Sequence, residues 1–406
     1  MVRRIFHVDL DAFFVAVERS LDSSLVGKPV VVGGVPGGRG VVACASYEAR
    51  AYGLRAGMPL YQSQRLCPKA IFVPGRYSRY QEVSEKFMGI LGDYTPFIEP
   101  MGIDEAYLDM TGFESLYGPM EGIARTIKER IKKEAVVTAS IGIASSRVVA
   151  KVASDYDKPD GLVEVPPGQD AAFLAPLPVG QLPGVGSKTE EVLKRFDITT
   201  VGQLAALSPV TLRRIFGVWG DLLHMWASGL DNSVVAPPGE AKSISRETTF
   251  AEDTLDMSFL RGILRYLGER VGASLRRQGK LARCVTLKLR YRDFETVSRH
   301  STLKIPADDD ATIFETGEHL LAKALKERRD KVRLIGIGVQ NLMSPGHQLS
   351  LFGSGSSSRR SLSEAMDVIR DRYGYTSIQR GLTYGLRDAF GEENGHFILK
   401  TPALSR

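Results

Sequence analysis

The feature that most constrains this chain is a set of acidic residues on two stretches that have the pattern of buried strands. The first stretch, RRIFHVDLDAFF, carries Asp9 and Asp11. The second, PMGIDEAYLDM, carries the adjacent pair Asp104 and Glu105 beside a short apolar alternation. Alternate residues of a strand lie on one face, so Asp9 and Asp11 are predicted to share a face. We expect the two stretches, although distant in sequence, to lie close together in one sheet.

An adjacent pair such as Asp104 and Glu105 would point to opposite faces of a regular strand. Gly102, just before the pair, supplies the backbone freedom for a bend that brings both to one site. Three converging carboxylates, those of Asp9, Asp104 and Glu105, repel one another unless cations lie between them, and Mg²⁺ takes such oxygen ligands together with nucleotide phosphates. Two such ions about 3.5–4 Å apart clamp both oxygens of an in-line phosphoryl displacement. Taken alone, an Asp-Glu pair is more often a pair of ordinary hairpin carboxylates with surface partners.

The composition is that of a soluble globular protein large enough for several domains, with 406 residues, 43% hydrophobic and 25% charged. The apolar run at the N-terminus is brief and is broken by Asp9 and Asp11, so we expect neither a signal peptide nor a membrane span, and a cytoplasmic protein. The cysteines, Cys44, Cys67 and Cys284, are few, odd in number and far apart, which favours reduced thiols over disulfides or a zinc site.

The order of patterns along the chain predicts a multidomain α+β protein. Helices are predicted at 13–21, 77–93 and 120–134, and strands at 96–100, 104–109 and 136–144. Residues 167–233 are predicted to be helical, and a polar, proline-containing linker follows at 234–243. The segment 244–341 returns to α+β, with two alternating strands and two amphipathic helices, and the tail has one predicted helix near 362–373.

Five motifs occur in a fixed order: DLDAFFVAVE, YEARAYGLRAGMPL, GIDEAYLD, GIASSRVVAKVASDYDKPDG and LPGVGSKT. Together they closely resemble the Y-family DNA polymerases of the DinB or DNA polymerase IV type, over about residues 4–352. The resemblance implies a right-handed polymerase with palm, small fingers, a helical thumb and a C-terminal little finger that grips DNA. The implied domains are palm 1–19 and 77–166, fingers 20–76, thumb 167–233, linker 234–243, little finger 244–341 and a C-terminal tail 342–406.

On this resemblance, two Mg²⁺ ions are held by the carboxylates of Asp9, Asp104 and Glu105 and the backbone carbonyl of Leu10. The role of Asp11 stays open between a direct metal contact and shaping of the strand. The chain departs from the pattern at Gly102, where most members have serine. The missing hydroxyl puts in question a local contact near the primer end, but leaves the carboxylates intact.

A triphosphate needs cationic partners besides metal ions. The resemblance assigns contacts with the β and γ phosphates to Tyr47 and Arg50, which are three residues apart on a predicted helix, and to Lys158, which precedes a proline and is therefore expected in a loop. Phe13 and Phe14 are assigned to the nucleotide site, with Phe14 as the steric gate whose ring would collide with a ribose 2′-hydroxyl. The alternative for Phe14 is a core aromatic.

Two segments are predicted to hold DNA. LPGVGSKT has the glycine spacing of a helix-hairpin-helix, with Gly184, Gly186 and Lys188 near a phosphate, and FGVWGD at 216–221 resembles a weaker second copy. The chain has a net charge of +6, and residues 241–340 hold 20 basic against 14 acidic residues, an equal excess. On the strand CVTLKLRYRDF of this segment, alternation is predicted to put one set of side chains on a single face that grips the duplex backbone: Thr286, Lys288, Arg290 and Arg292.

The peptide QLSLF at 348–352 resembles the bacterial sliding-clamp-binding motif. On that resemblance the docking residues are Gln348, Leu349, Leu351 and Phe352. A short apolar segment that folds back on the little finger is the alternative. The chain continues for 54 residues beyond this motif, and the sequence assigns no role to that tail.

These features predict a monomeric, template-directed DNA polymerase that adds deoxynucleotides to a primer 3′-hydroxyl. The small fingers present Ala43, Cys44 and Gly57 where the family meets the nascent base pair, which implies lesion tolerance and low fidelity. The sequence contains no second carboxylate cluster of the kind that would suggest a proofreading exonuclease. The rival hypotheses are a catalytically inactive DNA- and clamp-binding scaffold, a deoxycytidyl transferase, and a palm-like nucleotidyl cyclase.

Overall fold

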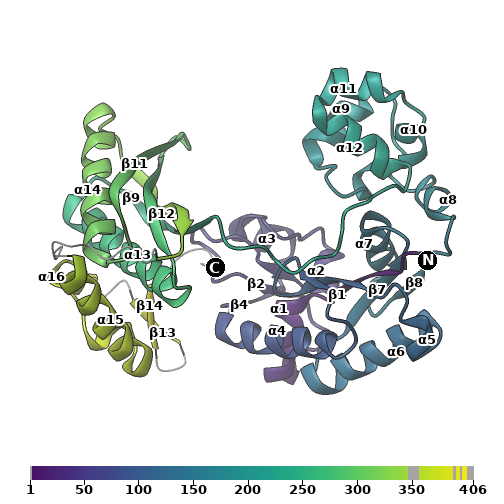
Figure 1. Ribbon diagram of the computed structural model, residues 1–406, viewed down its shortest axis with the longest axis horizontal. Helices are drawn as coiled ribbons and strands as arrows, with labels where there is room; N and C mark the ends of the chain where they lie inside the picture. The colour runs from purple at the N-terminus through teal and green to yellow at the C-terminus, as the bar shows by residue number, and fades with distance from the viewer. Residues whose placement is uncertain (1, 346–355, 387–389, 394–395, 400–406) are drawn as a thin grey trace. The chain divides into compact units, whose positions relative to one another are not determined.

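The computed structural model describes residues 2–345, 356–386, 390–393 and 396–399 (Figure 1). The chain divides into two compact units. Unit 1 comprises Met1–Val30, Cys44–Glu48 and Arg76–Gly239, and unit 2 comprises Val31–Ala43, Ala49–Gly75 and Glu240–Arg406. Within the described part of the chain, no helix has the length and apolarity needed to cross a membrane.

Unit 1 is built on a five-stranded sheet whose strands lie in the order β5-β6-β1-β7-β8. The strands are β1 (Ile5–Leu10), β5 (Ile98–Pro100), β6 (Glu105–Asp109), β7 (Ala139–Ala144) and β8 (Leu162–Glu164). Strand β1 is central and antiparallel to both β6 and β7. All residues of β7 are buried and nearly all of β1, because helices cover both faces of the sheet (Figure 1). The prediction that the two acidic stretches pair in one sheet is confirmed.

Helices flank this sheet on both faces. They are α1 (Phe13–Leu21), α4 (Tyr77–Gly92), α5 (Glu114–Tyr117), α6 (Met120–Arg130) and α7 (Arg147–Tyr156). Helix α7 packs directly on β7 and β1. Gly142 in β7 makes this approach possible, since an added Cβ would lie 2.1 Å from the carbonyl oxygen of Ala150. Ser146 caps the start of α7 by accepting a hydrogen bond from the amide of Val149.

The helix predicted at 120–134 and the strand predicted at 136–144 differ from the structure where they meet. Helix α6 ends at Arg130 and passes into a π-helical turn, Ile131–Ala135. Val136 then adopts a left-handed conformation with φ of 60°, which a strand residue does not have. Strand β7 therefore begins at Ala139, three residues later than the apolar pattern predicts.

Residues 167–233 are helical, as predicted. The elements are α8 (Asp170–Leu174), α9 (Ser187–Lys194), α10 (Val201–Ala205), α11 (Pro209–Phe216) and α12 (Val218–Ala227), with a short 3₁₀ turn at Val179–Gln181. Polar side chains define several of the starts. Thr200 forms a capping box with Gln203 at α10, and Ser208 caps α11 directly before Pro209.

The segment predicted as fingers contains a small sheet in the order β3-β2-β4. Its elements are a 3₁₀ turn (Ser23–Leu25), β2 (Val30–Val32), β3 (Cys44–Ala45), α2 (Tyr47–Arg50), α3 (Leu60–Leu66) and β4 (Ile71–Val73). Of this segment, Cys44–Glu48 belongs to unit 1, and Val31–Ala43 and Ala49–Gly75 belong to unit 2.

Unit 2 contains a four-stranded antiparallel sheet in the order β11-β10-β12-β9. The strands are β9 (Ser243–Thr254), β10 (Leu281–Tyr291), β11 (Thr296–Ala307) and β12 (Val332–Met343), and α13 (Met257–Arg277) and α14 (Asp310–Glu327) cover one face. The sequence predicts the two helices and the apolar central strands β10 and β12. It misses β9 and β11, because these are polar edge strands that each bury few residues.

The C-terminal tail forms a further layer on the helices of unit 2. Its elements are α15 (Ser356–Tyr373), a 3₁₀ turn (Tyr375–Ser377), α16 (Gly381–Tyr384) and a hairpin of β13 (Phe390–Glu393) and β14 (His396–Leu399). The fully buried carboxylate of Glu269 on α13 accepts hydrogen bonds from Arg370 and Tyr375, at 2.7 and 2.8 Å. Arg276 pairs with Asp367 at 2.6 Å. The predicted tail helix is confirmed and starts six residues earlier than expected.

Candidate active site and DNA-binding face

The candidate active site lies where β1 ends beside the start of β6. Asp9 and Glu105 are direct cross-strand partners, so their side chains share one face of the sheet. Asp104 lies in the bend before β6, and its carbonyl oxygen accepts a hydrogen bond from the amide of Leu10 at 2.9 Å. The predicted bend is therefore present, and it starts at Met101. An added Cβ at Gly102 would lie 3.2 Å from Oδ1 of Asp104, so a serine at this position would stand next to this carboxylate.

Asp11 lies beyond the strand that carries Asp9, but its carboxylate reaches the predicted face, because it contacts Ser140, the cross-strand partner of Asp9 on β7. Strand β1 ends at Leu10, and Asp11 lies in the following turn, where it is buried. Its Oδ1 accepts a hydrogen bond from Ser140 at 2.8 Å and its Oδ2 accepts one from the amide of Asp160, also at 2.8 Å. Its oxygens therefore tie the end of β1 to β7 and to the loop after α7.

Two lysines contact the strand carboxylates. Lys158 lies 2.7 Å from Asp9 and 2.6 Å from Asp155, and Lys151 on α7 pairs with Glu105. Burial raises the pKa of Asp9 to about 6, whereas His7 and Lys151 lower the pKa of Glu105 to about 2. The charge of Asp9 is thus the one that depends on a nearby cation.

The carboxylates of Asp9, Asp104 and Glu105 are oxygen ligands of the type that divalent cations prefer, but their side chains do not converge on one point in the structure. In the described ranges no three carboxylate, imidazole or thiol side chains form a metal-holding group. Asp9 and Glu105 each face an ammonium group. Burial raises the pKa of Asp9, and a divalent cation beside this carboxylate would favour its charged form.

The predicted phosphate-binding residues come from two places. Tyr47 and Arg50 are the first and last residues of α2, and the Tyr47 hydroxyl lies 3.3 Å from Oδ1 of Asp11. Lys158 lies in the loop after α7, as its position before a proline predicts. Burial lowers the pKa of the Lys158 ammonium. The negative charges of Asp9 and Asp155 outweigh this effect, and they raise the pKa above its ordinary value.

The two aromatic residues at the start of α1 have different environments. Phe13 is buried in the core, and Phe14 is partly exposed. The ring of Phe14 stacks on that of Tyr80 on α4, with centroids 4.3 Å apart and planes 17° apart. Tyr80 is fully buried and donates a hydrogen bond to Glu18 at 2.7 Å. Of the two phenylalanines, Phe14 is therefore the one whose ring is held in a fixed plane and still reaches the surface.

The helix-hairpin-helix candidate contains the turn that leads into α9. Gly184, Gly186 and Lys188 are exposed, and Gly186 directly precedes α9. Gly184 has a φ of 85°, and an added Cβ would lie 2.5 Å from the ring of Trp219. The second candidate copy, FGVWGD, joins α11 to α12 through Gly217 and supplies this tryptophan. The two segments are therefore parts of one packed unit.

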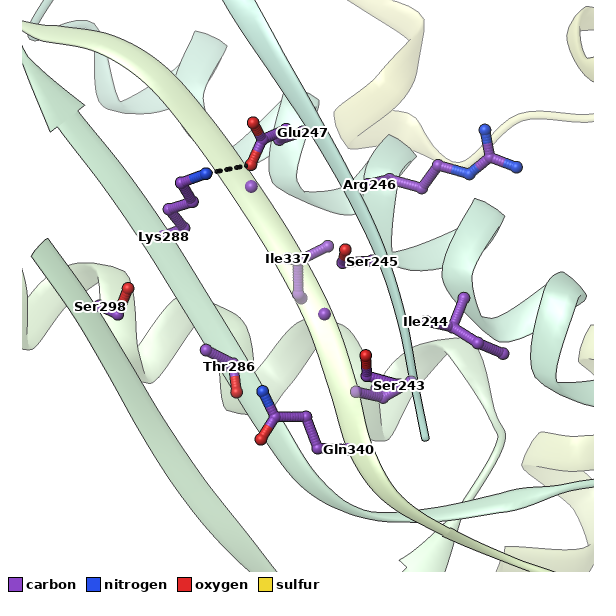
Figure 2. Close-up of a pocket in the computed structure, with 13 residues that line it drawn as sticks. Ser243, Ile244, Ser245, Arg246, Glu247, Thr286, Lys288, Ser298, Ile337 and Gln340 are labelled. Atoms are coloured by element: carbon purple, nitrogen blue, oxygen red, sulfur yellow. Dashed lines mark hydrogen bonds and ion pairs between the residues drawn. The ribbon is translucent and has the colours of Figure 1, made fainter. Parts of the chain in front are cut away.

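The open face of the unit 2 sheet presents small polar side chains (Figure 2). They come from all four strands and form a shallow cavity of about 200 Å³, lined among others by Ser245, Thr286, Lys288, Ser298 and Gln340. Gly336 and Gly338 on β12 leave the middle of this face without side chains, since an added Cβ at either would lie within 3 Å of a β9 side chain. Figure 2 shows Lys288 reaching to Glu247, at 2.7 Å.

The predicted basic strand face is present except for Arg292. Thr286, Lys288 and Arg290 alternate with buried residues on β10. Arg292 follows the end of the strand at Tyr291, where the register shifts, and it pairs with Asp330 at 3.2 Å. The prediction that Arg292 shares the face is therefore wrong. The peptide 348–352, with Gln348, Leu349, Leu351 and Phe352, lies outside the described residues.

Three residues around Glu105 were missed from the sequence: His7, Lys151 and Ser154. The signal for His7 was available, since it precedes Asp9 by two residues on the same strand and so lies on the same face. Lys151 and Ser154 are three apart on α7, but nothing in their spacing shows that this face of α7 meets β1.

Models of known families match most of the chain. The impB/mucB/samB family matches residues 8–155, the C-terminal domain of that family matches 241–351, and the thumb domain of DNA polymerase-iota matches 180–231. The chain is 49% identical to a DNA polymerase IV of Dehalococcoides mccartyi (strain CBDB1), over 96% of this chain and 100% of that protein. It is 37% identical to DNA polymerase IV 1 of Bacillus subtilis (strain 168), over 94% and 93% of the two chains.

Solved structures give the same result. A Y-family DNA polymerase chimera of Dbh and Dpo4 matches with a TM-score of 0.74 and 29% identity, over 84% of this chain and 100% of that one. The insertion ternary complex of Dbh DNA polymerase matches with a TM-score of 0.60, also at 29% identity and with the same coverage.

Proposed function

The chain belongs to the Y-family of DNA polymerases, in its DNA polymerase IV branch, and we propose that its carboxylate site at the β1–β6 junction carries template-directed translesion synthesis. The enzyme adds deoxynucleotides to a primer 3′-hydroxyl with low fidelity and without a proofreading exonuclease. The observation that carries the proposal is the direct cross-strand pairing of Asp9 with Glu105, with Asp104 in the bend beside them.

Two Mg²⁺ ions, when bound, neutralise the triphosphate and stabilise the attacking and leaving oxygens of the displacement. The residues that would hold them are Asp9, Asp104, Glu105 and the carbonyl oxygen of Leu10. Lys158, Tyr47 and Arg50 bind the β and γ phosphates by charge and hydrogen bonding. Lys158 forms an ion pair with Asp9 in the structure, so when a nucleotide binds, the lysine exchanges this carboxylate for a phosphate. The protein contributes mainly positioning and electrostatic stabilisation.

Primer extension tests the activity directly. A primed template with Mg²⁺ and four deoxynucleotides should be extended by the native chain, and a template with a bulky lesion should also be passed. An inactive scaffold would bind the same DNA without extending it. That alternative has no support from the relatives, and the cyclase does not account for the thumb match beside the C-terminal domain match. A deoxycytidyl transferase of the same family would need a protein-templating insertion, which the sequence does not show.

The remaining domain and partner assignments are proposals of the same kind. We assign palm, fingers, thumb and little finger to the boundaries predicted from the sequence, and DNA and deoxynucleotides as substrates. The relatives' solved complexes, an insertion ternary and a post-insertion binary complex, support these substrates. A monomer in the cytoplasm, docked on the sliding clamp through 348–352, completes the proposal.

The unit 2 sheet face provides a prediction on DNA binding. Replacing Lys288 and Arg290 together by alanine should lower affinity for primer-template DNA and make the slope of log affinity against log salt less steep by about 2, because two phosphate contacts and their released counterions are lost. Fluorescence anisotropy over a series of salt concentrations measures this. Arg292→Ala is the matched control and should change the slope by less than about 1, since Arg292 lies off the face. Equal slopes for the double variant and the native chain would contradict the assignment.

The docking peptide provides another prediction. Changing Leu351 and Phe352 to alanine should weaken clamp binding by about 100-fold, since two apolar anchors are removed from a short motif. Surface plasmon resonance on the immobilised bacterial clamp measures the affinity. Extension without clamp should stay as in the native chain, and clamp stimulation should disappear. Undiminished clamp affinity would favour the alternative in which the segment folds back on the little finger.

A further inference from the structure

The surroundings of Glu105 contain a buried polar chain that the proposed mechanism does not use. His7 on β1 is fully buried, and its Nδ1 lies 2.7 Å from the hydroxyl of Ser154 on α7. The ring also packs on Tyr107, with centroids 4.6 Å apart. On its other side, Nε2 lies 3.4 Å from Nζ of Lys151 and 3.3 Å from Oε2 of Glu105.

The hydrogen bonds of Ser154 bear on which ring nitrogen of His7 carries the proton. The Ser154 hydroxyl donates its single hydrogen to the carbonyl oxygen of Lys151, at 2.8 Å. Its oxygen is then free to accept, so Nδ1 of His7 is the donor in their contact. In a neutral imidazole with this proton, Nε2 accepts from the ammonium of Lys151, and an imidazole protonated at Nε2 instead donates to Glu105, so either form holds the Lys151–Glu105 pair. His7 therefore holds Lys151, and Lys151 holds Glu105.

We propose that Lys151 is a positioning residue of the polymerase site, oriented by His7, which holds the Glu105 carboxylate and disfavours divalent cations until the nucleotide arrives. The inference rests on the proposed function, because it takes Glu105 as a cation ligand. Lys151 differs from Lys158 in its surroundings. Lys158 lies in a loop between two carboxylates, whereas Lys151 is fixed on a helix by a buried acceptor.

The physical reason is charge. An ammonium beside a cation-binding carboxylate repels an incoming divalent ion, and at such short range this repulsion amounts to roughly a tenfold change in affinity even when screened as in water. Nucleotide phosphates add negative charge at the site and offset that repulsion. The order in which ions and nucleotide bind is therefore coupled through this lysine.

Direct binding of Mn²⁺ to the full chain without DNA and nucleotide tests the inference, with the free ion measured by electron paramagnetic resonance. Lys151→Met should bind Mn²⁺ about tenfold more tightly than the native chain, because the repelling charge is gone. Lys151→Arg should restore the native affinity. Lys133→Met is the matched control, since Lys133 is an exposed lysine of the same unit, and it should leave the affinity unchanged.

His7→Phe keeps an aromatic ring against Tyr107 but removes the acceptor, and should tighten Mn²⁺ binding to a value between those of the native chain and Lys151→Met. In a double variant with Lys151→Met, His7→Phe should not tighten Mn²⁺ binding any further. Thermal melting confirms that each variant is folded. Native or weaker Mn²⁺ affinity in Lys151→Met overturns the inference. The variant Asp104→Ala/Glu105→Ala must lose this Mn²⁺ binding, and if it keeps it, the assigned ion site itself fails.

Discussion

Replacing Asp104 and Glu105 together by alanine should abolish primer extension, lowering the rate of single-nucleotide insertion by about 10³-fold or more. The expected size follows from losing two of the three carboxylates that hold the catalytic ions, each worth several kcal/mol of charge stabilisation in the transition state. Only the carboxylate of Asp9 and the backbone carbonyl of Leu10 would remain of the proposed ligands, and one carboxylate cannot neutralise two divalent ions. Rapid-quench insertion of one deoxynucleotide measures the effect.

The same variant should bind primer-template DNA almost as the native chain does. The proposed DNA contacts are made by the unit 2 sheet and by the turn at Gly184, and they do not include Asp104 or Glu105. A control of equal size is Asp93→Ala/Glu134→Ala, which removes two exposed carboxylates that pair with Arg130 in the same unit. Insertion at more than a tenth of the native rate in the Asp104 and Glu105 variant would exclude the assigned site.

The pairing of the acidic strands was predictable because local and tertiary patterns agree there. Strand β1 is apolar on both faces apart from His7 and Asp9, and a charged residue is rarely buried in such a strand unless it is paired. The bend at Asp104 was also predictable, since Gly102 is the residue that permits it. Each of these features depends on a few residues that are neighbours in the sequence.

The features that the sequence did not reveal depend on contacts between distant segments. Asp11 looks like a strand partner of Asp9 by spacing, and only the positions of Ser140 and Asp160 show that its oxygens are used within the fold. Arg292 continues the alternation of β10 in sequence, but the strand stops at Tyr291, where the register shifts. The polar edge strands β9 and β11 are stabilised by pairing with β10 and β12 rather than by burial of their own side chains.

The tail illustrates the same limit. Its helix α15 has few apolar residues facing inward, so periodicity marks a helix but not what it contacts. The contact is made by charge. Arg276 bridges Asp310 and Asp367, and Glu269 receives Arg370 and Tyr375. Removing one partner of a buried ion pair leaves a buried charge without compensation, so the contact depends on all of its residues. Glu269 and Arg370 lie about 100 residues apart in this chain. No single segment of the sequence shows them.

Replacing Phe14 by alanine should raise ribonucleotide incorporation sharply, lowering the preference for deoxynucleotides over ribonucleotides by about 100-fold. An added hydroxyl is rejected by steric overlap rather than by a lost hydrogen bond, and overlap of this kind costs about 1–3 kcal/mol. The ring of Phe14 can enforce such overlap because it lies stacked on the buried ring of Tyr80, which Glu18 fixes in turn. A phenylalanine free to rotate would move aside at little cost. Insertion efficiencies for matched deoxy- and ribonucleotides measure the ratio.

Phe13→Leu is the matched control, because Phe13 neighbours Phe14 but is buried in the core. This change should lower the melting temperature and leave the sugar preference within about twofold. Phe13, which the resemblance also assigns to the nucleotide site, is buried in the core, and its ring does not reach the surface as that of Phe14 does. Tyr80→Phe, which keeps the stacked ring and removes only the hydroxyl, should retain most of the preference. A sugar preference unchanged in Phe14→Ala, with insertion of deoxynucleotides still at the native rate, would mean that Phe14 is a packing residue and that another group near the β1–β6 junction selects the sugar.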